Sequence, residues 1–148
     1  MMQLYTIGFT KKDARTFFEI LKAHQIRMVV DVRLNNVSQL AGYTKKNDFI
    51  YFLKQIGGIA YYHAVILAPT KEILDAYKKG QISWEEYENQ YNALLRRREV
   101  KEVLKENLNN NFDKVCLLCS EVTSEQCHRR LAAEYIKNYM GDIEIIHL

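Results

Sequence analysis

The clearest indication of fold class is the segment Arg27-Met-Val-Val-Asp-Val-Arg33, a near-continuous apolar run interrupted by Asp31. Runs of this kind are typical of a parallel strand that is covered on both faces. Short runs rich in apolar and branched residues predict four more strands, at 4–7, 59–67, 114–119 and 143–147. Helical spacing and capping signals predict helices between them, at 13–24, 45–56, 69–80, 83–104 and 123–140.

Strands that alternate with helices indicate an α/β protein. We expect a single three-layer domain over residues 1–148, with a mostly parallel five-stranded sheet and helices on both faces. A doubly wound strand order such as 3-2-1-4-5 would place the first and fourth strands side by side at a topological switch point. Ligands of such sheets bind there, outside the carboxyl ends of the strands.

The composition excludes several protein classes. A chain of 148 residues with 48% hydrophobic and 26% charged residues is neither disordered, nor collagen-like, nor a disulfide scaffold. Its longest apolar runs have five residues, too few for a membrane span, and no secretory signal is visible. The three cysteines all lie within 116–127, which favours a reducing, cytoplasmic setting. A net charge of +3 indicates a polyanionic partner only weakly.

Reactive side chains follow the predicted fourth strand. Cys119 and Glu121 come at its end, and Cys127 and His128 open the next helix. A thiolate at Cys119 or Cys127 would be a nucleophile, with His128 or Glu121 as proton carrier. The alternative is that these cysteines are only packed in the core, where free cysteines are common. Cys116 is interpreted as a core residue.

Two arginines are candidates for anion binding. Arg129 lies in the first turn of a helix, where its charge opposes the helix dipole and where anions bind. Arg33 shares a strand face with Asp31, which could orient it towards an anion. The alternatives are an Asp31–Arg33 ion pair that positions a loop, and pairing of the helix arginines with nearby glutamates.

A metal site and a nucleic-acid surface are weaker possibilities. The spacing C-x2-C-x7-C-H resembles a zinc site, but a strand would separate the first two sulfurs and neighbours on a helix would diverge. We therefore expect no metal and no cofactor. The run Arg96–Arg98, with Lys101 and Lys105, is the best candidate for a nucleic-acid patch. A solvated helix face with an Arg98–Glu102 pair is the alternative.

Several motifs taken together resemble the domain-of-unknown-function family 488. They are Tyr5-Thr-Ile-Gly8, Asp31-Val-Arg33 with Ser38 downstream, Leu118-Cys-Ser-Glu121 and Cys127-His-Arg-Arg130. The resemblance spans nearly the whole chain and implies a small α/β protein of prokaryotic type, with no established activity. It also marks Gly8 and Ser38 as members of the candidate anion site. The chain has Phe9 where this family often has histidine.

Three functions remain open at this point. One is an anion-binding protein that could act as a thiol-dependent enzyme on a small molecule bearing a phosphate or carboxylate. The second is a nucleic-acid or nucleotide-binding module without turnover. The third is a redox sensor in which Cys119 and Cys127 form a reversible bridge. The sequence assigns neither an oligomeric state nor a role to the segment 67–106.

Overall fold

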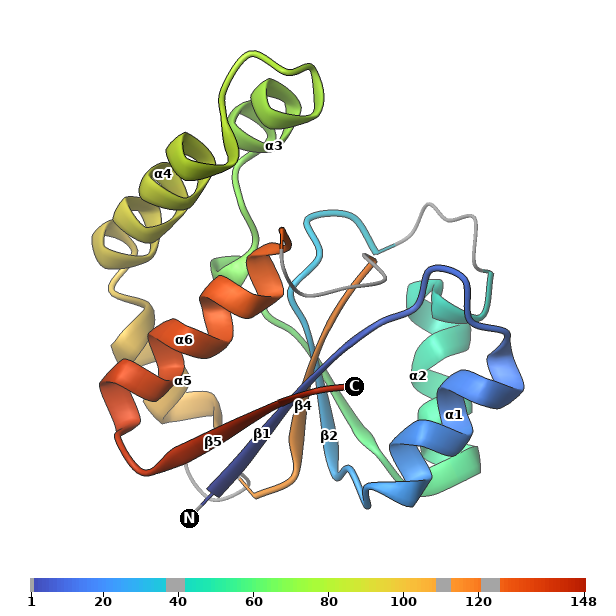
Figure 1. Cartoon of the computed structure of the whole chain (residues 1–148). Helices are drawn as coiled ribbons and strands as arrows, with labels where there is room; N and C mark the ends of the chain where they lie inside the picture. Colours follow the sequence, from blue (N-terminus) through green and yellow to red (C-terminus); the bar gives the residue numbers. More distant parts are fainter. Residues whose placement is uncertain (1, 37–41, 109–112, 121–125) are drawn as a thin grey trace.

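A computed structural model describes residues 2–36, 42–108, 113–120 and 126–148 (Figure 1). Strands alternate with helices as the sequence predicts. The strands are β1 (Met2–Gly8), β2 (Met28–Asp31), β3 (Ala60–His63), β4 (Val115–Cys119) and β5 (Ile143–His147). The α-helices are α1 (Ala14–Ala23), α2 (Lys46–Gly57), α3 (Lys71–Lys78), α4 (Trp84–Arg97), α5 (Val100–Leu108) and α6 (His128–Met140), and the 3-10 turns are η1 (Gly42–Thr44) and η2 (Val65–Leu67).

The five strands form one parallel sheet, which confirms the predicted fold class. Their order is β3-β2-β4-β1-β5, so the suggested order 3-2-1-4-5 is wrong in one exchange. The fourth strand is inserted between β2 and β1, and the connection from β1 to β2 passes over it. The first and fourth strands are nevertheless neighbours, as expected, and Gly8 pairs with Cys119 at their carboxyl ends.

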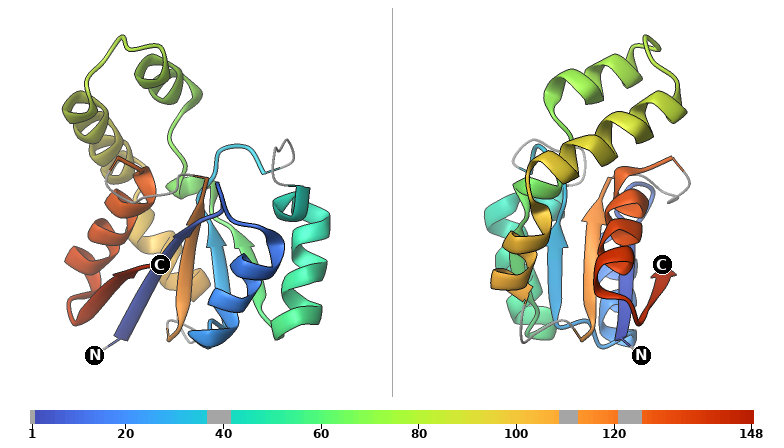
Figure 2. Two further views of the ribbon diagram at one scale, coloured as in Figure 1. Left: turned by 45° about the vertical axis from the view of Figure 1, so that its right-hand side comes forward. Right: turned by 90° about the vertical axis from the view of Figure 1, so that its left-hand side faces the viewer.

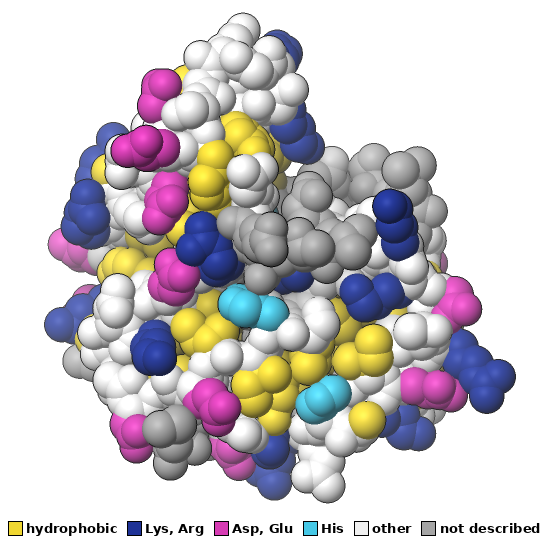
Figure 3. Space-filling view, in the orientation of Figure 1, with side chains coloured by type: hydrophobic (Ala, Val, Ile, Leu, Met, Phe, Trp, Pro, Cys, Tyr) yellow, Lys and Arg dark blue, Asp and Glu magenta, His cyan; other side chains and the backbone are white. Residues whose placement is uncertain are grey.

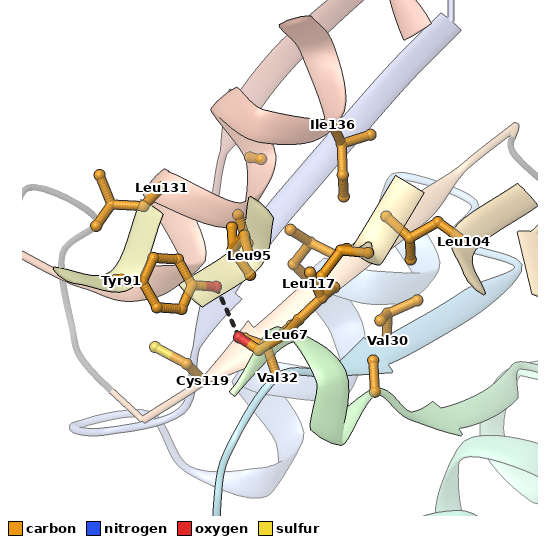
Figure 4. Close-up of a cluster of buried hydrophobic side chains, with 14 of the residues drawn as sticks. Val30, Val32, Leu67, Tyr91, Leu95, Leu104, Leu117, Cys119, Leu131 and Ile136 are labelled. Carbon is orange, nitrogen blue, oxygen red and sulfur yellow. Dashed lines mark hydrogen bonds between the residues drawn. The ribbon is translucent and has the colours of Figure 1, made fainter. Parts of the chain in front are cut away.

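The helices cover both faces of the sheet. Helices α1 and α2 lie on one face, and α4, α5 and α6 lie on the other (Figures 1 and 2). Alternate β4 residues therefore enter different cores: Cys116 and Leu118 pack with α1 and α2, whereas Leu117 and Cys119 pack with α4–α6. Cys119 lies beside Tyr91 in the second of these cores (Figure 4).

Several predicted elements have different bounds in the structure, including the third strand and the helices after Ser83 and Thr123. The strand expected at 59–67 ends at His63 and is followed by η2, whose Leu67 carbonyl accepts a 2.6 Å hydrogen bond from buried Tyr91. The helix expected at 83–104 is broken between Arg97 and Val100, where Glu99 has a φ of 51°. Helix α6 begins at His128, with Cys127 as its N-cap. The capping signal predicted at Thr123 lies outside the described residues.

The first part of the segment 67–106 rises above the sheet. Helix α3 and the start of α4 stand beyond the carboxyl ends of the strands, where they form a wall over that edge (Figure 2). Ser83 caps α4 by accepting a 3.1 Å bond from the backbone N–H of Glu86, as the sequence predicts. Residues of β4 and α4 belong to one hydrophobic core, which extends to the site described next.

Candidate functional site: a dithiol pocket

A pocket of about 310 Å³ lies at the carboxyl edge of the sheet, under the wall formed by α3 and α4. It is lined by residues that follow three different strands: Phe9 after β1, Arg33 after β2, and Cys119 and Ser120 at the end of β4. Gln126, Cys127 and His128 line it from the start of α6. The segments that the sequence analysis expected at one edge are thus brought together here.

Cys119 and Cys127 form the floor of this pocket. Their sulfur atoms are in disulfide contact, while their Cα atoms are 7.8 Å apart. Both side chains are almost completely buried, at 1% and 2% exposure, and still line the pocket. Cys127 has extended backbone as the N-cap of α6, and its Sγ accepts from the backbone N–H of Arg129 at 3.5 Å. The second cysteine therefore sits at the positive end of a helix dipole.

His128 is held in one orientation next to the two sulfurs. Its Nε2 lies 2.6 Å from the carbonyl oxygen of Val32, which can only accept, so Nε2 carries the proton in the neutral ring. Burial, helped by the charge of Arg129, lowers the pKa of His128 to about 4, against the opposing effect of its hydrogen bond to the Val32 carbonyl. The imidazole is therefore neutral near pH 7, and the lone pair is on Nδ1.

Arg129 is buried beside the same sulfurs, with 1% of its surface exposed. Its Nη1 lies 3.6 Å from Cys119 Sγ, and its Nε donates to Thr6 Oγ1 at 3.3 Å. Thr6 in turn contacts His147 Nδ1 at 2.6 Å. This arrangement places a fixed positive charge beneath the dithiol, at the arginine that the sequence analysis singled out.

Arg33 makes a buried ion pair with Asp31. The guanidinium donates to both carboxylate oxygens, from Nε at 2.8 Å and from Nη2 at 2.7 Å. It also donates to the hydroxyl and the carbonyl of Thr44, at 3.2 and 2.8 Å. These are the contacts of an ion pair that positions a loop, here η1, which was the second of the two sequence-based interpretations. Its charge is balanced by Asp31 before any ligand binds.

The other predicted site residues have varied positions. Gly8 ends β1, and its carbonyl oxygen accepts a 2.8 Å bond from Lys12. Arg130 forms an ion pair with Glu134 at 2.9 Å on the surface of α6. Ser38 and Glu121 lie outside the described residues, so their proposed roles stay predictions.

The sequence analysis missed an aromatic wall. Tyr77, Trp84 and Tyr87 line the pocket from α3 and α4, and the Trp84 and Tyr87 rings are stacked with centroids 5.0 Å apart. A signal was present, because Trp84, Tyr87 and Tyr91 lie at helical spacing on one face of α4. Aromatic residues at that spacing usually pack in the core. These residues line a pocket only because α4 lies above the sheet.

Cys119, Cys127 and His128 also form a possible metal-ligand group, with one ligand atom each and all three atoms within 4.8 Å of one another. Cys116 points to the opposite face of the sheet, where burial raises the pKa of its thiol. A four-ligand site that uses all three cysteines is therefore not formed. The expected divergence of Cys127 and His128 does not occur, because Cys127 precedes the helix and is free of helical geometry.

One arginine of the basic run at the end of α4 makes hydrogen bonds within the protein. Arg98 donates from Nη1 to the carbonyl oxygens of Ile66 and Ala68, at 3.0 and 2.6 Å. Because α4 ends at Arg97, Arg98 and Glu102 do not share a helix. On the face shown in Figure 3, Lys and Arg side chains are interspersed with Asp and Glu. These features give a nucleic-acid surface no support beyond the sequence itself.

Comparison with known proteins identifies the family of the chain. The model of the domain of unknown function DUF488 matches residues 13–136, which includes the strands and helices from α1 to most of α6. No curated protein and no solved structure matches the chain. Within the described residues, none of the helices has the length and apolar character needed to cross a bilayer. The sequence motifs, the parallel α/β fold and this match together show that the chain belongs to the DUF488 family.

Proposed function

We propose that this protein is a thiol-dependent redox protein, in which Cys119 and Cys127 bridge reversibly at the floor of a pocket for a small anionic molecule. The observation that carries the proposal is the direct contact of the two sulfur atoms at the pocket floor. A dithiol in that position exchanges electrons with a disulfide that enters the pocket, or with another mild oxidant.

Cys127 is the better candidate for the attacking thiol. Its sulfur caps a helix N-terminus and accepts a backbone N–H, which favours a thiolate at Cys127. The charge of Arg129 acts on both sulfurs, at 3.6 Å from Cys119 and 4.0 Å from Cys127. The thiolate attacks one sulfur of a substrate disulfide, forms a mixed disulfide and releases the first thiolate. Cys119 then attacks the Cys127 sulfur, closes the bridge and releases the second. Two electrons pass to the substrate, and the protons of the two cysteines are released.

Bridge formation is coupled to the shape of the pocket. Relaxed disulfides have Cα atoms about 4.4–6.8 Å apart, whereas those of Cys119 and Cys127 are 7.8 Å apart. A relaxed bridge therefore draws the end of β4 and the start of α6 together. Because both segments line the pocket, the oxidised and reduced proteins would present different pockets, as a redox sensor requires.

The lining of the pocket favours a substrate with an apolar or aromatic body and a negative charge. Trp84 and Tyr87 offer ring surfaces, and Lys78 adds a cation at the rim. Arg129 contributes positive potential from below the sulfurs. Arg33 contributes less, because Asp31 neutralises it. An aromatic disulfide that carries carboxylates combines these features in one test molecule.

The test is oxidation of the reduced protein, read by intact mass. We expect a mild oxidant to remove two hydrogen atoms and a reductant to restore them. The Cys119→Ser and Cys127→Ser variants should both lose this change, whereas Cys116→Ser, the matched control from the opposite face of the sheet, should keep it. A wild-type mass that does not change, or a change that persists in Cys119→Ser, would refute the proposal.

A second measurement tests the anionic substrate. The bis-carboxylated aromatic disulfide dithiobis(nitrobenzoate) should oxidise the dithiol faster than the dicationic disulfide cystamine, once each rate is divided by the rate with free cysteine. Lys78→Glu should reduce that ratio, because it reverses a charge at the rim. A ratio near one, unchanged by Lys78→Glu, would remove the anionic substrate and leave the redox pair intact.

A further inference from the structure

The group formed by Cys119, Cys127 and His128 has a second use that needs no bridge. Two thiolates and one neutral imidazole form a ligand set typical of zinc, and they come from two rigid elements, the end of β4 and the start of α6. Their ligand atoms lie within 4.8 Å of one another. Tetrahedral zinc, with bonds of about 2.0–2.3 Å, holds its ligand atoms roughly 3.5–3.8 Å apart, so the two sulfurs, which are in disulfide contact, separate to that distance once the bridge is reduced.

The backbone spacing leaves room for an ion. The Cα atoms of Cys119 and Cys127 are 7.8 Å apart, which is wider than the roughly 4.4–6.8 Å that is usual for disulfides. An ion between two thiolates keeps the sulfurs further apart than a covalent bond does. This Cα spacing therefore suits a bridging ion better than it suits a relaxed disulfide.

His128 already has the outer contact of a metal ligand. Histidines that bind metals usually donate their second N–H to a carboxylate or a backbone carbonyl, which fixes the tautomer and the ring orientation. His128 makes this contact from Nε2 to Val32 at 2.6 Å, which leaves Nδ1 as the ligand atom. The orientation of the ring is further restricted by the edge of Tyr91, with centroids 5.8 Å apart.

We propose that the reduced protein binds one zinc ion through Cys119 Sγ, Cys127 Sγ and His128 Nδ1, with the fourth position open to the pocket. Three protein ligands and an open position are the pattern of catalytic rather than structural zinc sites. Two thiolates balance the charge of a divalent ion, and Arg129 adds one positive charge next to Cys119. The fourth position can then take water, hydroxide or the anionic group of a molecule bound in the pocket.

The site shares its thiols with the proposed redox pair but does not depend on redox cycling. The two are mutually exclusive states of the same sulfurs, because a bridged pair has no thiolates to offer. Zinc would accordingly protect the pair from oxidation, and oxidation would release zinc.

The test uses reduced, chelator-treated full-length protein and the metal ion alone. Cobalt(II) should give a thiolate-to-cobalt charge-transfer band and the intense visible bands of a tetrahedral site at one equivalent. Zinc should displace cobalt, and competition with a chromophoric chelator should give its affinity. His128→Gln should lower the affinity for zinc by more than the roughly 100-fold that is lost when an outer contact of a metal ligand is removed. Cys116→Ser should leave the affinity for zinc unchanged.

The outcomes separate the two proposals. A cobalt spectrum without charge transfer, or a zinc affinity unchanged in both His128→Gln and Cys119→Ser, would overturn the metal site. His128→Gln should still form the Cys119–Cys127 bridge under oxidant, which reports that the variant is folded. A bridge without zinc binding therefore rejects this inference alone, and zinc binding without a bridge rejects the redox function alone.

Discussion

Removing the charge of Asp31 should destabilise the protein strongly. The carboxylate is fully buried and accepts four hydrogen bonds: from Arg33 Nε and Nη2, from the Arg33 backbone N–H at 3.1 Å, and from Tyr61 at 2.6 Å. In Asp31→Asn the Arg33 guanidinium, which is only 5% exposed, keeps its charge without a carboxylate. Breaking a buried pair from one side costs about 3–5 kcal/mol in free energy of unfolding.

The lower end of that range applies, because an amide oxygen still accepts one or two of the bonds. A loss of about 3 kcal/mol, with a urea slope of about 2 kcal/mol/M, lowers the unfolding midpoint by roughly 1.5 M. The matched control is Glu19→Gln, which breaks the exposed Arg15–Glu19 pair at 3.1 Å and should cost under about 1 kcal/mol. If Asp31→Asn cost no more than this control, the reasoning that Asp31 and Arg33 act as a structural pair would be refuted.

Three further predictions concern Tyr91, Cys116 and His147. Tyr91→Phe leaves the Leu67 carbonyl without its 2.6 Å bond, so chemical denaturation should show a loss of about 1–3 kcal/mol, and no loss would contradict the buried bond. Cys116 should resist iodoacetamide at pH 8 in the folded protein, because burial raises the pKa of its thiol; mass spectrometry of native and unfolded samples checks this, and equal labelling would argue against it. Burial and then the charge of Arg129 lower the pKa of His147 below its usual 6.5. Folding therefore favours the neutral ring. The contribution of the neutral ring to the free energy of unfolding is present above about pH 6.5 and is lost as the pH falls through the lower pKa of the folded state. An NMR titration that gives His147 a pKa at or above the free value would contradict this.

The sheet was predictable because burial on both faces leaves a strong pattern. Near-continuous apolar runs such as 27–33 are typical of covered parallel strands, and alternation along β4 separates Cys116 from Cys119. The strand order was harder to predict. A connection long enough to hold a helix can lead to the strand on either side, or can pass over a neighbouring strand to the next one. The insertion of β4 between β1 and β2 leaves no mark in the sequence of the strands themselves.

The break between α4 and α5 shows the limits of local signals. Neither glycine nor proline marks it, and Glu99 adopts a φ of 51°, which costs energy for a residue with a side chain. Arg98 then anchors the turn on the carbonyl groups of Ile66, in η2, and of Ala68, which follows η2. Tertiary contacts of this kind override local helix propensity and cannot be read from spacing.

The candidate site was predictable in its location and less so in its geometry. The carboxyl ends of parallel strands meet at one edge, so Arg33, Cys119 and His128 were expected together, and all three line the pocket. The contact between the two sulfurs depends on Cys127 being the N-cap rather than part of the helix. If the helix began one residue earlier, the Cys127 sulfur would point away from Cys119. Helix boundaries inferred from sequence are not accurate to one residue, so this contact could not be predicted.

The central claim is that Cys119 and Cys127, and not Cys116, form a reversible bridge. It is tested most directly by mapping the linkage in mildly oxidised protein with a protease that cleaves after glutamate. Cleavage after Glu121 and Glu125 separates Cys127 from the other two cysteines. We predict that its peptide stays joined to the one containing Cys119, in wild type and in Cys116→Ser, until a reductant is added. Separate peptides from oxidised wild-type protein, or a linkage that disappears in Cys116→Ser, would contradict the account.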